Sequence, residues 1–366
     1  MMPSLFFYVD VLEEGSAAQQ VLDRLLFGWP ERGRFAEAPW GNILLPDHLN
    51  GPAVERRLRA TDKLSLIPQN KGLPEGCAAW IVAPGKPDHW DVKLNQAWYE
   101  ALSKCSQPGW VIGLPPRPWC DEALPQTPRF QAGTALPWTW RLPEVDLPNQ
   151  CPLEEVMVLI RGPYHQAEKQ AVDALLSLIW HRRGGESGID SVRLLQGDKV
   201  WQGARDGLFA WDLFKAAISR SHSKQGDAKI DGRTQDIVGL GMVPSLARDT
   251  RAWIIQHVDG LQSVILSVDG IINDDTFAAR SKDGGIFSAQ FYQPPRPSDH
   301  RFSRLTSTIV RSLDGTQSSP PPQRHLLWID LIDCMDSMMS GMISKKSWEH
   351  PHKPYHCSHS LWQSES

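Results

Sequence analysis

Apolar and polar positions follow two different patterns along this chain. In the first 148 residues, short apolar runs alternate with segments whose apolar positions have helical spacing. Such alternation is typical of a parallel sheet with covering helices. Between residues 252 and 297, runs rich in β-branched residues are separated by Asp259-Gly260, Asp269-Gly270 and Asp283-Gly284. Because glycine adopts positive φ without a Cβ clash, these steps predict tight turns, and the block predicts about four antiparallel strands.

The first half of the chain predicts an α/β domain. The expected strands are residues 4–12, 64–67, 78–83, 110–114 and 130–136. The expected helices are residues 17–27 after a Ser16 cap, 52–60 and 89–105, with one helical turn at 119–124. Residues 29–52 form a passage rich in proline and glycine. The alternation of strand and helix predicts that residues 1–148 form one α/β domain with a parallel sheet.

Residues 149–345 predict an α+β domain with an open antiparallel sheet. Its expected elements are a strand at 156–161, a helix at 165–183, a hairpin of 191–196 with 199–202, a helix at 208–221, the strands of 252–297, and helices at 300–313 and 324–343. The hairpin is inferred from Gly197-Asp198, which lies between its two runs. Residues 346–366 are expected to form a flexible, histidine-rich tail.

Composition excludes several classes of partner. The formal net charge of −4 over 366 residues shows no bias towards nucleic acid. No apolar window has the length that spans a bilayer. The six cysteines are widely spaced, and the first residues lack the basic segment of a signal peptide. We therefore expect a cytoplasmic protein that binds neither nucleic acid nor membrane.

The tail contains residue types that bind transition metals. They are His350, His352, His356, Cys357 and His359. The segment is polar and interrupted by prolines, and nothing in its sequence predicts a scaffold that would hold these side chains together. We therefore predict no metal site.

Several passages in the second half resemble one family of oxidoreductases. They are AGTALPWTWRLPEVDLP (132–148), RRGGESG (182–188), VRLLQGDKVW (192–201), the strand block 252–297 and PPPQRHLLWIDLIDCMDS (320–337). Together they resemble the Gfo/Idh/MocA oxidoreductases over roughly residues 130–345. The resemblance implies a Rossmann-like domain that binds NAD or NADP, joined to a domain whose open sheet binds substrate and packs subunits together. It also implies a sugar- or polyol-like ligand and a homo- or hetero-oligomer formed through that sheet.

The phosphate-binding mark of this family is absent. A GxGxxG turn lets backbone N–H groups approach a pyrophosphate at a helix N-terminus. After residues 4–12 this chain has Glu13-Glu14-Gly15-Ser16 instead. Two interpretations stay open. Either strand 4–12 is the family's second strand, with Asp10 in place of the ribose-binding acid and the first βα unit absent, or it is the first strand with an altered loop.

Two further marks of the family are missing or displaced. The resemblance implies a lysine after the fifth strand, where this chain has VIGLPPRP (111–118), so Arg117 is the only cation available. It also implies an acid and a histidine on the long helix of the second domain, which fall over Gln170-Ala171. His165, Glu168 and Lys169 lie one to two turns earlier, and His165 is the candidate general acid or base.

Two functional hypotheses follow. In the first, the chain is a divergent NAD(P)-dependent oxidoreductase with Asp10 near the ribose, Arg117 near the reacting carbon and His165 as acid or base. In the second, it binds no cofactor and is a catalytically inactive homologue that acts as a binding, sensor or partner subunit.

Overall fold

The structure is a computed structural model, and it divides into two compact units. It describes residues 3–31, 33–68, 73–87, 89–123, 130–162, 165–223, 236–293, 300–317, 321, 323–341 and 345–347. Unit 1 combines the chain up to Trp138 with residues 294–329, and unit 2 combines residues 139–293 with the segment from Asp330 onward. A parallel sheet in unit 1 and a largely antiparallel sheet in unit 2 confirm the predicted fold class. The return of residues 294–329 to unit 1 was not predicted.

The sheet of unit 1 is parallel throughout its described strands. These are β1 (Ser4–Tyr8), β4 (Asn42–Pro46), β5 (Leu64–Ile67), β6 (Cys77–Val82), β7 (Gly109–Ile112) and β8 (Phe130–Gly133). Their order is β5-β4-β1-β6-β7-β8. This is the order of a doubly wound dinucleotide-binding sheet, in which the first strand lies beside both the second and the fourth.

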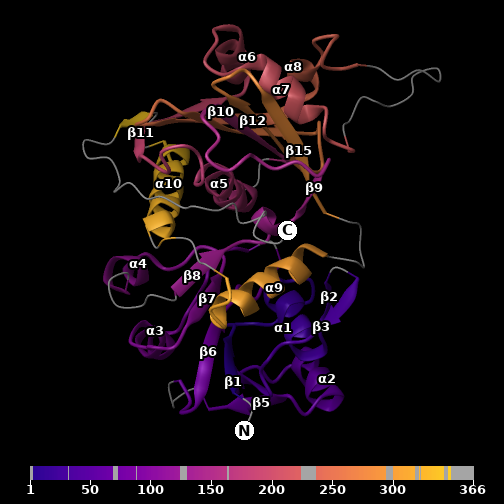
Figure 1. Ribbon diagram of the computed structural model, residues 1–366, viewed down its shortest axis with the longest axis vertical. Helices are drawn as coiled ribbons and strands as arrows, with labels where there is room; N and C mark the ends of the chain where they lie inside the picture. Colours follow the sequence, from indigo (N-terminus) through magenta and orange to yellow (C-terminus); the bar gives the residue numbers. More distant parts are fainter. Residues whose placement is uncertain are drawn as a thin grey trace, which may run out of the picture. The chain divides into compact units, whose positions relative to one another are not determined.

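Helices complete unit 1. They are α1 (Ala17–Phe27), α2 (Pro52–Ala60), α3 (Gln96–Ser103), α4 (Arg117–Ala123) and α9 (His300–Leu313), with a 3₁₀ turn η2 at Leu136–Trp138 and a small hairpin of β2 (Trp29–Glu31) and β3 (Arg34–Ala36). Ser16 caps α1, and the buried face of α1 consists of alanine, valine and leucine side chains. Helix α9 lies beside α1 (Figure 1), where Arg24 Nε donates to Ser303 Oγ at 3.0 Å.

The sheet of unit 2 is mixed. Its described strands are β9 (Trp140–Leu142), β10 (Leu153–Ile160), β11 (Ile189–Gln196), β12 (Arg248–His257), β13 (Gln262–Asp269), β14 (Asp275–Ser281), β15 (Ile286–Tyr292) and β16 (Lys345–Ser347). Their order is β16-β11-β12-β13-β10-β14-β15-β9. The four strands predicted for residues 252–297 are present, but the almost wholly buried β10 separates the pair β12–β13 from the pair β14–β15. They therefore form two hairpins and no continuous meander.

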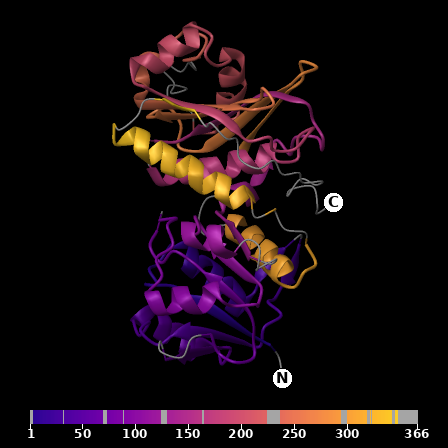
Figure 2. The same cartoon turned by 90° about the vertical axis from the view of Figure 1, so that its left-hand side faces the viewer.

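Helices cover both faces of this sheet. Alternate residues such as Ala252 and Ile254 of β12 join a core with α6 (Asp198–Arg205), α7 (Trp211–Ile218) and α8 (Val243–Leu246). The other face lies against α5 (His165–Ile179), and Figure 2 shows the sheet edge-on between these layers. Helices therefore lie against both faces of the described sheet, and the predicted oligomerisation through this sheet stays a prediction.

The predicted hairpin of 191–196 with 199–202 is wrong. Residues 198–205 form α6, and β11 pairs with β12 and β16. Gly197 ends the strand at φ +57, and Val200 and Trp201 are one helical turn from the start of α6 and buried. A helical spacing of apolar residues therefore outweighed the turn signal. The last helix, α10 (Gln323–Met339), agrees closely with its expectation.

Candidate functional site

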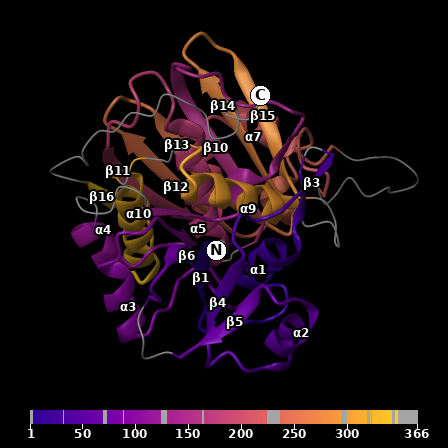
Figure 3. The same cartoon turned by 60° about the horizontal axis from the view of Figure 1, so that its bottom comes forward.

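The carboxyl edge of the unit 1 sheet is the place where this fold binds a ligand. Strand β1 pairs in parallel with β4 on one side and β6 on the other, which makes it the first strand of the sheet (Figure 3). The interpretation of residues 4–12 as a second strand is therefore wrong. The second strand is β4, and the acid that directly follows it is Asp47, which is exposed. Asp10 instead lies in the β1–α1 loop, residues 9–16.

Several N–H groups of the β1–α1 loop donate hydrogen bonds to acceptors within the protein. Glu13 N donates to Gly85 O at 3.0 Å, and Gly15 N donates to the Gln19 side chain at 2.9 Å. At the start of α1, Gln19 N donates to Ser16 Oγ at 3.1 Å. A pyrophosphate cradle needs such donors to point at the ligand. In this loop the N–H groups of Glu13 and Gly15 already have acceptors within the protein.

Charge and packing in the loop also disfavour a pyrophosphate. Glu13 and Glu14 are exposed at the helix N-terminus, where they would repel a phosphate group. Gly85, which follows β6, packs so closely that a Cβ added to it would collide with the carbonyl oxygen of Val11. The two loops that flank the crevice between β1 and β6 are thus in direct backbone contact. These residues do not fit the pyrophosphate of NAD or NADP in the usual manner, and we assign no step to the cofactor.

The three candidate residues lie on separate elements. The Asp10 carbonyl accepts a hydrogen bond from His48 Nε2 at 3.1 Å, which ties the loop to the residue after Asp47. Arg117 follows β7 and begins α4, so it does occupy the position after the fifth strand. His165 begins α5 in unit 2, and its side chain lies outside the described residues. Their roles stay predictions.

Helix α5 carries buried charged residues that the sequence did not identify as a group. Glu168, Lys169 and Asp173 each expose at most 4 % of their surface. Glu168 forms an ion pair with Arg251 at 3.2 Å and accepts a hydrogen bond from the indole N–H of Trp253 at 3.1 Å. Lys169 and Asp173 are four residues apart and so lie on one face of the helix. Charged side chains are seldom buried on a helix that contributes only packing.

Comparison with known proteins resolves the fold. No protein-family model and no curated protein matches the chain in sequence. Among solved structures, myo-inositol dehydrogenase from Lactobacillus casei, in complex with NAD(H) and myo-inositol, is similar with a TM-score of 0.58 and 9 % identity over 97 % of this chain and 99 % of that one. The chain has the fold of the Gfo/Idh/MocA oxidoreductases.

Two further structures of the Gfo/Idh/MocA fold extend this likeness. GenD2 from gentamicin A biosynthesis, in complex with NAD, has a TM-score of 0.55 and 10 % identity over 96 % of this chain and 98 % of its own. Myo-inositol dehydrogenase from Corynebacterium glutamicum has a TM-score of 0.53 and 9 % identity over 96 % and 100 %. Both units are therefore represented in the shared fold.

A buried Ser-His-Glu arrangement in unit 2 is structural. Ser263 Oγ lies 2.9 Å from His257 Nε2, and His257 Nδ1 lies 3.0 Å from Glu186 Oε1. These distances resemble a nucleophilic triad. However, Ser263 is fully buried, and Arg182 holds Glu186 through two hydrogen bonds of 3.0 and 3.3 Å. A substrate cannot reach this serine, so the group stabilises the region around the RRGGESG segment.

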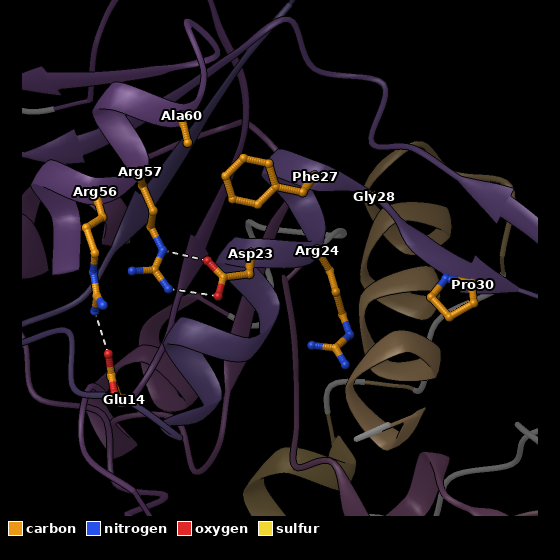
Figure 4. A pocket seen from close by; sticks show the side chains of 9 residues that line it. All are labelled: Glu14, Asp23, Arg24, Phe27, Gly28, Pro30, Arg56, Arg57 and Ala60. Atoms are coloured by element: carbon orange, nitrogen blue, oxygen red, sulfur yellow. Dashed lines mark hydrogen bonds and ion pairs between the residues drawn. The ribbon is translucent and has the colours of Figure 1, made fainter. Parts of the chain in front are cut away.

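A groove of about 550 Å³ lies in unit 1 beside α1 and α2 (Figure 4). Two of the three arginines that line it are paired with acids of the chain itself. Arg57 donates to both carboxylate oxygens of Asp23, at 2.5 and 2.7 Å, and Arg56 forms an exposed ion pair with Glu14. The third, Arg24, donates to Ser303 Oγ and to Gln20. The ion pair between Arg56 and Glu14 attaches the β1–α1 loop to α2.

Two other features complete the site survey. Nowhere in the described ranges do three His, Cys, Asp or Glu side chains come together as a metal site would require. The tail histidines and Cys357 lie outside those ranges. Among the helices that the structure describes, none combines the length and the apolar character needed to cross a bilayer.

Proposed function

We propose that this chain is a divergent oxidoreductase of the Gfo/Idh/MocA fold that acts on a hydroxyl group of a sugar- or polyol-like molecule. The observation that supports the proposal best is the likeness over nearly the whole chain to dehydrogenases such as the one solved with NAD(H) and myo-inositol. Buried Lys169 and Asp173 on α5 add charged groups to the unit that binds substrate in this family.

NAD or NADP is the cofactor class that belongs to this proposal. The β1–α1 loop does not supply its usual phosphate contacts, so a dinucleotide would be held by other groups. Asp10 lies shortly after β1, and Asp47 directly follows β4. Both are therefore candidates for binding the ribose hydroxyls. Arg117 is the candidate near the reacting carbon, and His165 is the candidate acid or base.

A second candidate function is that of a catalytically inactive binding, sensor or partner subunit. One observation favours it, namely the internal satisfaction of the N–H groups in the β1–α1 loop. In this case the chain would keep a polyol-like ligand and lose the nicotinamide.

Titration of the purified protein with NADH and NADPH, followed by nicotinamide fluorescence, separates the two candidates. The oxidoreductase proposal expects saturable binding of one nicotinamide and turnover of at least one member of a panel of sugars and polyols that includes myo-inositol. A polyol that raises the melting temperature without any nicotinamide binding would support the second candidate. The absence of both effects would contradict the sugar- or polyol-like ligand itself.

Two substitutions test the assigned roles. His165→Asn and Arg117→Gln are each expected to lower kcat by about 10²–10⁴-fold, the usual loss when a positioned acid, base or charge is removed. The matched controls are His222→Asn and Arg59→Gln, whose side chains are exposed on other elements. Equal kcat in the His165 variant and its control would remove His165 from the mechanism.

A further inference from the structure

Contacts on three sides hold the β1–α1 loop in place. On the β4 side, His48 Nε2 donates to the Asp10 carbonyl at 3.1 Å. On the β6 side, Glu13 N donates to Gly85 O at 3.0 Å, and the Val11 carbonyl packs on Gly85. On the α2 side, the Glu14 carboxylate accepts from Arg56, as Figure 4 shows. The loop therefore joins the ends of β4, β1 and β6.

The loop is also closed upon itself at the start of α1. Ser16 Oγ donates to Glu13 O at 2.7 Å and accepts from Gln19 N at 3.1 Å. Gln19 in turn accepts from Gly15 N at 2.9 Å. Val9 is fully buried and Leu12 nearly so, and the burial of these two side chains also holds the loop in place. The N–H groups of Glu13, Gly15 and Ser16, at the position of the glycine-rich turn, therefore donate within the protein and do not point at a phosphate.

We infer that residues 9–16 are a structural brace that ties β4, β1 and β6 at their carboxyl ends, and that this segment does not bind the pyrophosphate of a dinucleotide. The inference rests on the proposed function only in taking a nicotinamide dinucleotide as the ligand to be tested. It changes the expected mode of cofactor binding in this fold. The pyrophosphate of a bound dinucleotide would then be held by groups outside the loop.

The binding arm of the test uses NADH and NADPH with the full chain and with Glu13→Gln, whose exposed carboxylate takes no part in the three contacts. A cradle would respond to the loss of a nearby negative charge with tighter binding, whereas a brace would not. Equal dissociation constants in both proteins support the inference and the proposed function together. No binding to either protein supports the inference and contradicts the nicotinamide-dependent part of the proposed function. A change of more than about threefold, roughly 0.7 kcal/mol, overturns the inference and leaves the proposed function intact.

The stability arm compares Gly85→Ala with Gly51→Ala. The new methyl group at position 85 meets a backbone carbonyl, which cannot swing aside, so we expect the melting temperature to fall by several degrees. Gly51 has φ −81 and nothing within 4 Å of its added Cβ, so its variant should melt close to wild type. If Gly85→Ala prevents folding, His48→Ala provides the milder removal of one contact. Wild-type melting in both Gly85→Ala and His48→Ala overturns the brace.

Discussion

At the scale of single residues, the buried carboxylate of Glu186 has several charged and polar partners in unit 2. It accepts from Arg182, His257 and Gly188 N. Glu186→Gln keeps the shape of the side chain but leaves the Arg182 cation without its main counter-charge. We expect the free energy of unfolding to fall by about 3–5 kcal/mol, because a buried pair is broken from one side. Urea unfolding at neutral pH measures this, with exposed Glu154→Gln as the control. A loss equal to that of the control would contradict the structural role.

The same residue predicts a dependence of stability on acid. Burial alone would raise the pKa of Glu186, but His257 and Arg182 hold it well below its ordinary value of 4.5. A group whose pKa is lower in the folded state stabilises the fold above its unfolded pKa, and that contribution is lost as the pH falls towards the folded value. We therefore expect the urea midpoint to decline below about pH 4.5 in the wild type, and less steeply in Glu186→Gln. Parallel pH profiles for the two proteins would contradict this origin.

The sequence indicated some candidate residues and not others for physical reasons. The absence of a glycine-rich turn at residues 13–16 was visible directly, and the structure shows that the N–H groups of Glu13, Gly15 and Ser16 donate within the protein. Asp47 was not a candidate because its strand, β4, is short and lies within a passage rich in proline and glycine. The buried state of Lys169 and Asp173 depends on tertiary packing, which helical periodicity does not specify.

At the scale of elements, the N-cap residue of α1 stabilises both the helix and the β1–α1 loop. Ser16 is fully buried, and its hydroxyl accepts from Gln19 N and donates to Glu13 O. Ser16→Ala removes both bonds, so we expect a loss of unfolding free energy of about 1–2 kcal/mol. The control is Ser103→Ala in the last turn of α3, whose hydroxyl bonds only to Glu100 O. Equal urea midpoints for the two variants would contradict the dual role of Ser16.

Most helices and strands could be predicted, and their pairing could not. Helices α1, α2, α5, α9 and α10 lie where the sequence predicted helices, and α1 buries one apolar face as its periodicity indicates. The neighbours of a strand depend on residues far away in the chain. Nothing local to β10 indicates that it would separate β13 from β14, since both alternatives bury the same apolar side chains.

At the scale of the whole molecule, α9 links a late segment of the chain to unit 1. Its described side chains are largely buried, Leu305 and Ile309 completely, and it contacts α1, β2, β7 and η2. The expected domain 1–148 does not contain this helix. The local periodicity of residues 300–313 predicted a helix correctly but could not indicate which unit it would join.

This arrangement predicts how fragments of the chain behave. A fragment of residues 1–148 would leave the apolar faces that α9 covers on α1 and β7 exposed to water, so we expect it to bind a hydrophobic dye and to lack a cooperative thermal transition. Residues 1–138 joined by a flexible linker to 300–317 restore α9 to its partners and should melt cooperatively with a near-UV circular dichroism signal. The same linked fragment carrying Leu305→Asp and Ile309→Asp is the matched control, because it supplies the same length of chain without the buried face.

Cooperative melting of the 1–148 fragment by itself would show that α9 is dispensable and that the boundary near residue 148 delimits an autonomous domain. Failure of the linked fragment alone would mean that unit 1 needs more of the chain than residues 1–138 and 300–317.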